Sequence, residues 1–197
     1  MYIDTNYQFG YNDTLRVFAI DPSSSSTGFV VLDVNLVDWS IAVVYAQTYY
    51  RTHMLKSMRW QAEVYGEMET AVIGYGRAVS ELLTIWRPST VICESPYLGR
   101  LPQAFRALTM VQTSIRDAVY RYDHTLNLDL IDPASVKKYM GVSGKSNDKS
   151  LMTTALLNTA LPLTYANGVS PLELDEHCID AICVGLFTIG NYKKIMQ

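Results

Sequence analysis

The stretch RVFAIDPSSSSTGFVVLD, residues 16–33, decides the fold class. RVFAID is a short apolar run that ends in an acid, and FVVLD is a second apolar run, so both segments predict β-strands. The DPSSSSTG between them is rich in residues that favour turns. The stretch therefore predicts a β-hairpin with Asp21 at the end of its first strand.

The segments that follow the hairpin predict a mixed α/β domain. WSIAVVYAQTYY, from Trp39, is rich in β-branched and aromatic residues and predicts a third antiparallel strand. Two further strands are predicted at TVICE and at LDLID. Apolar residues at helical spacing predict helices over 55–86, 103–121, 134–140, 149–161 and 176–190. Glycines at positions 66, 74 and 76 are candidates to bend or break the first helix. This order predicts a mixed five-stranded sheet, a three-strand meander plus parallel strands, flanked by helices.

Length and composition predict one soluble domain. A chain of 197 residues with 49% hydrophobic residues has enough apolar material for a single core, here 1–197 with 1–14 as an N-terminal extension. No basic start followed by an apolar run marks an export signal, and no stretch approaches the roughly 20 apolar residues that span a bilayer. Cys93, Cys178 and Cys183 lack CxxC spacing and are predicted to be small buried side chains. We therefore expect a cytoplasmic protein that is not secreted.

Charge is unevenly distributed along the chain. The net charge is −3, which argues against general polyanion binding. Residues 100–149, in contrast, hold eight basic and five acidic residues and are net positive by three. A local phosphate-binding surface is the corresponding expectation. The basic residues are Arg100, Arg106, Arg116, Arg121, Lys137, Lys138, Lys145 and Lys149.

Three acids fall at the ends of predicted elements. Asp21 ends the first strand, Glu94 ends the fourth, and Asp180 lies early in the final helix, one turn after His177. An ionised acid at the end of a buried strand is costly unless it meets a cation or a donor. Converging carboxylates suit Mg²⁺ or Mn²⁺, and such centres serve phosphoryl transfer.

Each of these residues also has an ordinary structural interpretation. Asp21 precedes a proline and would suit a turn, and Glu94 would suit a solvated strand end. His177 would suit a helix terminus, and Asp180 would favour the positive end of the helix dipole. Only their combination favours a functional site.

Four segments, in this order, resemble the RuvC-type Holliday junction resolvases. RVFAIDPSSSSTGFVVLD resembles their opening hairpin, and VICESPYLGR is similar to their second acid-bearing strand. VKKYMGVSGKSNDKSLM resembles their basic loop and following helix, and HCIDAICVGL resembles their closing helix. The segments span residues 16–186, and the extended N-terminus and divergent middle are similar to viral members. The resemblance implies the RNase H-like fold of the retroviral integrase-like nuclease superfamily.

The resemblance also implies a catalytic centre with two Mg²⁺ ions, for which Mn²⁺ would substitute. Asp21, Glu94 and Asp180 match the metal ligands, and His177 stands where the family has Asp or His, on the same helix face as Asp180. Asp175 and Glu176 are alternatives if the register slips. Asp21 would be shared by both ions.

Basic and aromatic residues around these segments are candidates for DNA contacts. Lys149 matches a family lysine near the scissile phosphate, and Lys137 matches another basic position. Tyr97 falls where the family places an aromatic residue that unstacks bases. Tyr97 could equally be a packing residue, and the lysines could be solvated surface residues. The remaining candidates for DNA binding are Arg100, Lys138 and Lys145.

Two departures from the family pattern are visible. Ser23 stands where the family usually has glycine, which changes little because serine also suits turns. The lead into the basic loop is shortened around residues 139–142, which affects the register of Lys137 and Lys138.

The activity implied by the resemblance is hydrolysis of four-way or other branched DNA into 5′-phosphate and 3′-hydroxyl ends. Paired cuts imply a homodimer, for which the apolar stripe of residues 103–121 is one candidate interface; intramolecular core is the other use of such a stripe. Two alternatives remain: an actin-like ATPase or other nucleotide-binding module, which would need more chain, and a branched-DNA-binding protein that has lost cleavage.

Overall fold

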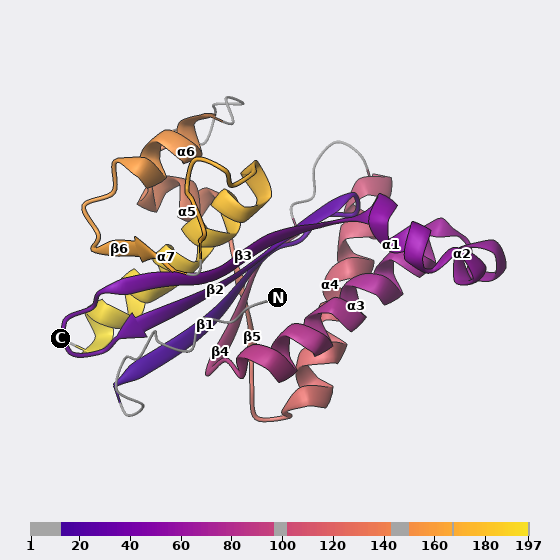
Figure 1. Ribbon diagram of the computed structural model, residues 1–197, viewed down its shortest axis with the longest axis horizontal. Helices are drawn as coiled ribbons and strands as arrows, with labels where there is room; N and C mark the ends of the chain where they lie inside the picture. Colours follow the sequence, from indigo (N-terminus) through magenta and orange to yellow (C-terminus); the bar gives the residue numbers. More distant parts are fainter. Residues whose placement is uncertain (1–12, 97–101, 143–149, 167, 197) are drawn as a thin grey trace.

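The strands form one mixed sheet. A computed structural model describes residues 13–96, 102–142, 150–166 and 168–196, and within these ranges it places six strands in the order β5-β4-β1-β2-β3-β6. The predicted meander is present as three antiparallel strands, and β4 and β5 follow in parallel beyond β1 (Figure 1). The strands are β1 (Thr14–Asp21), β2 (Ser26–Asn35), β3 (Ile41–Tyr50), β4 (Thr90–Glu94), β5 (Leu128–Ile131) and β6 (Leu163–Tyr165).

The sixth strand corrects the predicted number of five. β6 is three residues long and pairs in parallel with the start of β3, from Ile41 to Val43. Three residues are too few to show the alternation that identifies a strand in a sequence. β6 is a strand because it pairs with the free edge of β3, a contact between segments that are distant in the sequence.

Helix positions agree with the prediction except in one region. The predicted helix 55–86 is three helices, α1 (Arg51–Ser57), α2 (Arg59–Tyr65) and α3 (Glu67–Trp86). Gly66 has a φ of 85°, which a helix cannot continue through, and Met58 leaves helical geometry with ψ at 37°. The others are α4 (Pro102–Tyr122), α5 (Pro133–Tyr139), α6 (Ser150–Leu157) and α7 (Glu176–Met196).

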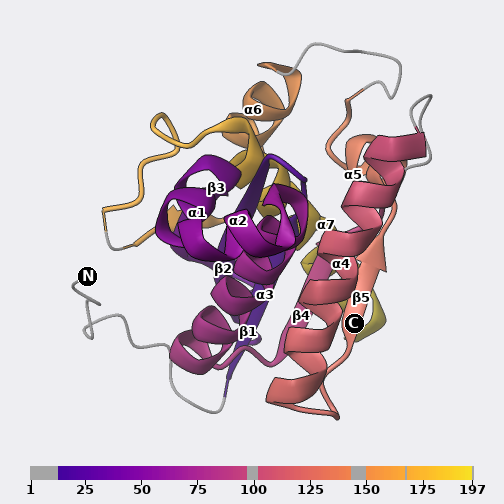
Figure 2. The same cartoon turned by 90° about the vertical axis from the view of Figure 1, so that its right-hand side faces the viewer.

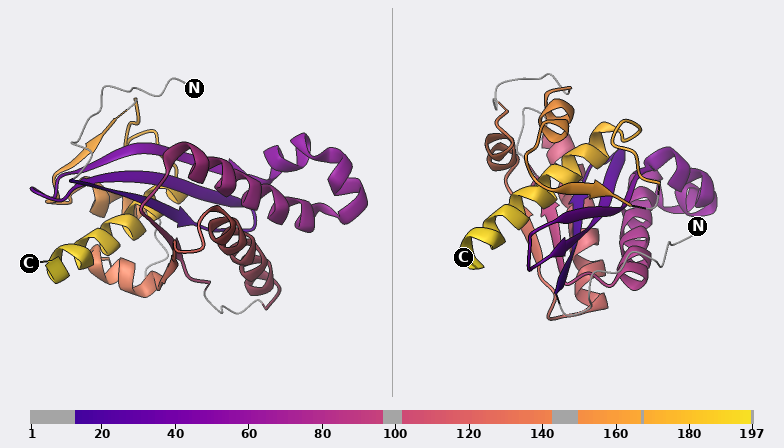
Figure 3. Two further views of the ribbon diagram at one scale, coloured as in Figure 1. Left: turned by 90° about the horizontal axis from the view of Figure 1, so that it is seen from below. Right: turned by 60° about the vertical axis from the view of Figure 1, so that its left-hand side comes forward.

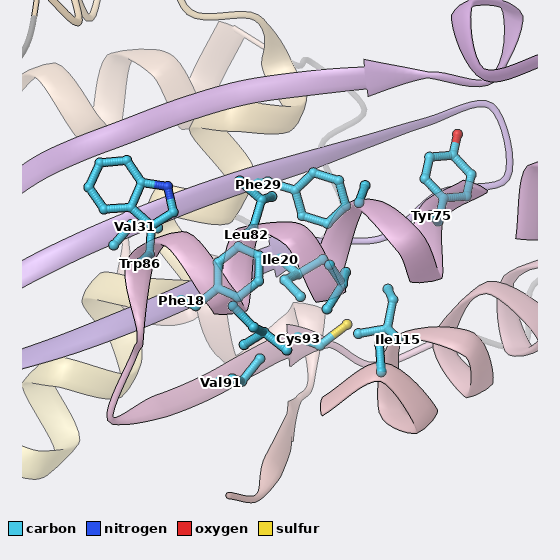
Figure 4. Packing of buried hydrophobic residues seen from close by; sticks show 14 of the residues in the cluster. Phe18, Ile20, Phe29, Val31, Tyr75, Leu82, Trp86, Val91, Cys93 and Ile115 are labelled. Atoms are coloured by element: carbon cyan, nitrogen blue, oxygen red, sulfur yellow. The ribbon is translucent and has the colours of Figure 1, made fainter. Parts of the chain in front are cut away.

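The sheet separates two hydrophobic cores. α3 and α4 cover one face, where Phe18, Ile20 and Phe29 meet Tyr75 and other helix residues (Figures 2 and 4). The last helix, α7, crosses the opposite face with α5 and α6 beyond it (Figure 3). Because side chains alternate along a strand, every second residue of β1 faces α7.

Two predictions about side chains and membranes can be compared with this fold. All three cysteines are buried, and none forms a disulfide, as predicted. Among the helices in the described ranges, none is long and apolar enough to cross a bilayer.

Candidate active site

Asp21 and Glu94 stand next to each other at the carboxyl ends of neighbouring parallel strands. Ile20 of β1 is in register with Cys93 of β4, so the next residue of each strand is an acid. Both acids continue the alternation that points Ala19 and Ile92 into the core beneath α7. The two carboxylates therefore share one face and one edge of the sheet.

The N-terminal end of α7 lies against this edge because β2 has a glycine there. Gly28 pairs with Asp21 across the hairpin. A Cβ atom at Gly28 would overlap the backbone carbonyl of His177, so only glycine allows the helix to approach this closely. The approach brings the first two turns of α7, with His177 and Asp180, to the carboxylates.

His177 connects α7 to both strands of the hairpin. Its Nδ1 lies 2.9 Å from Oδ2 of Asp21, and its Nε2 lies 2.6 Å from Oγ of Ser26. The hydrogen bond to Asp21 raises the pKa of His177 above its usual value, against the opposing effect of burial. The contact with Asp21 therefore favours the imidazolium form more than in a free histidine, and in that form both ring nitrogens would donate.

Asp175 has a structural role at the start of α7. Its carboxylate accepts hydrogen bonds from the Thr48 hydroxyl at 2.6 Å, the Tyr50 hydroxyl at 2.7 Å and the Cys178 backbone amide at 3.1 Å. Burial raises the pKa of Asp175, but these bonds outweigh it and hold the pKa below its usual value. Asp175 thus caps the helix and fastens it to β3, which disfavours it as a metal ligand.

Burial and mutual repulsion perturb the other acids. Asp21 is only 9% exposed, and burial raises its pKa although the bond to His177 opposes this. Burial, with the charges of Asp21 and Asp180, raises the pKa of Glu94 to about 8. Burial and the charge of Asp21 raise the pKa of Asp180 to about 7. Three carboxylates that resist ionisation in one place mark a site prepared for positive charge.

Lys137 of α5 supplies part of that charge. It lowers the pKa of both Glu94 and Asp180, so it lies within electrostatic range of the two carboxylates. Its neighbour Lys138 is exposed. The resemblance had matched Lys137, and not Lys138, to a basic position of the family, and the fold separates the two lysines in the same way.

A divalent cation fits the chemistry of these donors. Oxygen-rich, partly buried sites with excess negative charge favour Mg²⁺ or Mn²⁺, and cation binding would offset the repulsion that raises the pKa values of Glu94 and Asp180. Among the residues with described structure, no three His, Cys, Asp or Glu side chains already form a group that could hold a metal ion. If His177 is also a ligand, its hydrogen bond to Asp21 would be released when the metal binds.

The remaining predicted contacts divide into two groups. Lys137 and Lys138 both lie on α5. Lys137 is near the carboxylates, and Lys138 is exposed on the surface. Tyr97, Arg100, Lys145 and Lys149 lie outside the described residues. Ser26 was not predicted, because its contact with His177 joins positions 151 residues apart in the sequence.

Comparison with known proteins gives a clear result for the fold. No protein-family model and no curated protein matches the chain. Among solved structures, it is similar to RuvC of Thermus thermophilus, with 17% identity, a TM-score of 0.63, and coverage of 91% of this chain and 97% of that one. The chain is also similar to the yeast mitochondrial Holliday junction resolvase Ydc2, with 13% identity and a TM-score of 0.63. That match covers 92% of this chain and 83% of Ydc2. The fowlpox virus Holliday junction resolvase has 11% identity and a TM-score of 0.55, with 90% and 99% covered.

These similarities extend over nearly the whole chain and confirm the fold expected from the four sequence segments. Each of the three solved structures covers at least 90% of this chain. The chain therefore has the RNase H-like fold of the RuvC-type Holliday junction resolvases.

Proposed function

We propose that this protein is a metal-dependent endonuclease that cuts four-way or other branched DNA. The observation that carries the proposal is the cluster of buried Asp21 with partly buried Glu94 and Asp180, at the end of the sheet where β1, β4 and α7 meet. The structures of similar fold support the substrate class, since one of them is a RuvC bound to a Holliday junction.

The chain's own residues have distinct parts in this proposal. Asp21, Glu94 and Asp180 would hold the metal ions, with His177 as a further ligand. Bound Mg²⁺ would activate water and stabilise the leaving oxygen of the cleaved phosphodiester. Lys137 would attract the scissile phosphate toward the acids and offset its charge. Lys149, whose role rests on the resemblance alone, would add a second positive charge there.

His177 has a further task before metal binds. As an imidazolium it neutralises part of the negative charge on Asp21, and its bond to Ser26 fixes the ring. This arrangement would reduce the repulsion between Asp21 and the neighbouring acids while no cation is present. Loss of the proton would free His177 to act as a neutral ligand.

Resolution of a four-way junction needs two cuts at symmetric positions. We therefore propose that the protein acts as a homodimer with two-fold symmetry, so that each copy cuts one strand. Sedimentation of the protein with and without junction DNA tests this part separately from cleavage.

Lys137→Gln is expected to slow junction cleavage about 10- to 100-fold, because the phosphate loses a positioned charge beside the carboxylates. Lys138→Gln, on the neighbouring exposed residue, is the matched control and should change the single-turnover rate less than about threefold. Equal effects of the two substitutions would contradict a specific role for Lys137.

The substrate class is tested with a panel of labelled DNA: a four-way junction, a flap, a linear duplex and an RNA–DNA hybrid. The proposal predicts paired nicks in the junction that a DNA ligase can reseal, because the products carry 5′-phosphate and 3′-hydroxyl ends. Cleavage of the hybrid alone would reassign the substrate. Binding of the junction without cleavage in Mg²⁺ or Mn²⁺ would favour a protein that has lost catalysis.

A further inference from the structure

The two short helices α1 and α2, residues 51–65, form an arm that projects beyond the end of the sheet (Figures 1 and 3). The arm begins where β3 ends, and Tyr50 pairs there with Ser26 of β2. The Arg51 amide donates to the carbonyl of Ser25 at 2.9 Å, within the turn that follows Asp21. The base of the arm therefore lies beside the candidate active site.

The base of the arm is firmly attached. Met54 is buried against Gly74 of α3, where a larger residue would collide with its side chain. Met58 is buried as well, and the Tyr50 hydroxyl holds Asp175 at the start of α7. The base of the arm is thus attached both to α3 and to the start of α7.

The outer part of the arm exposes large side chains that no core uses. Trp60 is 64% exposed, whereas Trp39 and Trp86 are buried. Val64 and Tyr65 are also more than half exposed, and the Trp60 and Tyr65 rings meet edge to face with centroids 6.4 Å apart. A grouping of exposed aromatic residues on a projecting element is typical of a binding surface.

Charge on the arm identifies the kind of partner. Residues 51–65 contain three basic residues and one acid, in a chain whose net charge is −3. Within the part of the chain that the structure describes, only Arg51 of the three pairs with an acid outside the arm, Glu67 of α3 at 2.7 Å. The acid, Glu63, pairs with Arg59 at 3.2 Å, but both side chains are largely exposed, so the pair contributes little and a phosphate can compete for the arginine. Lys56 is exposed near the end of α1, four residues before Trp60 in the sequence. Aromatic rings beside arginine and lysine favour nucleic acid over an apolar protein surface.

We propose that the arm binds the DNA strand that leaves the catalytic centre, with an unpaired base of the branch stacked on Trp60 and phosphates bound by Lys56 and Arg59. The inference rests on the proposed function and extends it, since it adds a contact outside the acids and the basic segment 100–149. Stacking on an aromatic ring tolerates any base. The arm would therefore contribute affinity for unpaired regions without sequence preference.

The test measures binding of a labelled four-way junction in Mg²⁺ by anisotropy, in an Asp21→Asn background so that the DNA stays intact. Trp60→Ala should weaken binding about tenfold, and Trp60→Phe, which retains a ring, should weaken it less. Tyr120→Ala is the matched control, because Tyr120 is equally exposed. It lies near the end of α4 that leads into the start of β5, whereas Glu94 lies at the other end of these strands. Junction DNA should also quench the tryptophan fluorescence of the parent protein, and Trp60→Phe should lose most of that quenching.

Three results would overturn the inference. Unchanged affinity and quenching in the Trp60 variants would leave the arm without a DNA contact, while cleavage by the wild type would keep the proposed function intact. A shift from dimer to monomer in Trp60→Ala, with unchanged affinity per monomer, would make the surface a contact between copies. Failure of the wild type to bind or cut any DNA would remove the proposed function and the inference together.

Discussion

Glu94→Gln is expected to reduce cleavage of a four-way junction at least about 10²- to 10³-fold and, at the same time, to stabilise the metal-free protein at pH 8. The loss of activity follows from removing one of the carboxylates that would hold the metal. The gain in stability follows from the electrostatics of the site. Burial and the neighbouring acids raise the pKa of Glu94 from 4.5 to about 8, so ionising it in the folded protein is unfavourable.

The sign of the pH dependence follows from proton binding. Between pH 4.5 and about 8 the folded protein binds the Glu94 proton more tightly than the unfolded chain does. The stability that Glu94 contributes is therefore fully present below pH 4.5 and declines as the pH rises from 4.5 to about 8. The expected loss is on the order of a few kcal/mol, and glutamine avoids it.

Chemical denaturation in EDTA at pH 5 and pH 8.5 measures this effect. Wild type should lose stability between the two values more than Glu94→Gln does, and added Mg²⁺ should stabilise wild type more than the variant at the higher pH. Glu81→Gln, at an exposed position of α3, is the matched control and should follow wild type. A variant less stable than wild type at pH 8.5, or one that cuts at the wild-type rate, would contradict the proposed site.

Gly28→Ala is expected to lower the free energy of unfolding by about 2–3 kcal/mol and to slow cleavage at least about 10²-fold. The added methyl group would overlap the backbone carbonyl of His177, and backbone cannot move aside as a flexible side chain does. Relief of the overlap would push the start of α7 away from Asp21. A displacement of about 1 Å at a catalytic group is enough for a loss of this size.

Gly168→Ala separates the two effects. Gly168 has a φ of 76° and no neighbour within 4 Å of an added Cβ, so alanine there costs about 1–2 kcal/mol of backbone strain without moving α7. Denaturation and single-turnover cleavage of both variants are the measurements. Loss of cleavage in Gly168→Ala to the same degree, at a temperature where both proteins are folded, would show that stability alone governs the rate.

The sequence predicted the elements whose pattern is local. The hairpin around Asp21, the strand ending at Glu94 and the helix containing Asp180 each have a clear apolar period and a turn or breaker at the end. The convergence of the acids followed from their places at element ends. These features account for the five predicted strands, all of which are present, and for the proposed metal ligands.

The features that the sequence did not predict depend on contacts between distant residues. β6 exists only through β3, and the functions of Ser26 and Asp175 require α7 to lie on the hairpin. The composition of the basic segment does not separate Lys137 from Lys138; only the resemblance singled out Lys137, and the fold brings its charge within range of Glu94 while Lys138 is exposed. The break at Gly66 was among the three predicted at glycines, whereas the break at Met58 has no glycine or proline to mark it in the sequence.

The most direct test of the central proposal is single-turnover cleavage of a four-way junction by wild type and by Asp21→Asn, each with Mg²⁺ and with EDTA. The proposal predicts paired nicks only for wild type with Mg²⁺, while Asp21→Asn still binds the junction. Cleavage by Asp21→Asn at the wild-type rate, or cleavage that persists in EDTA, would show that Asp21, Glu94 and Asp180 are not a metal-dependent catalytic centre.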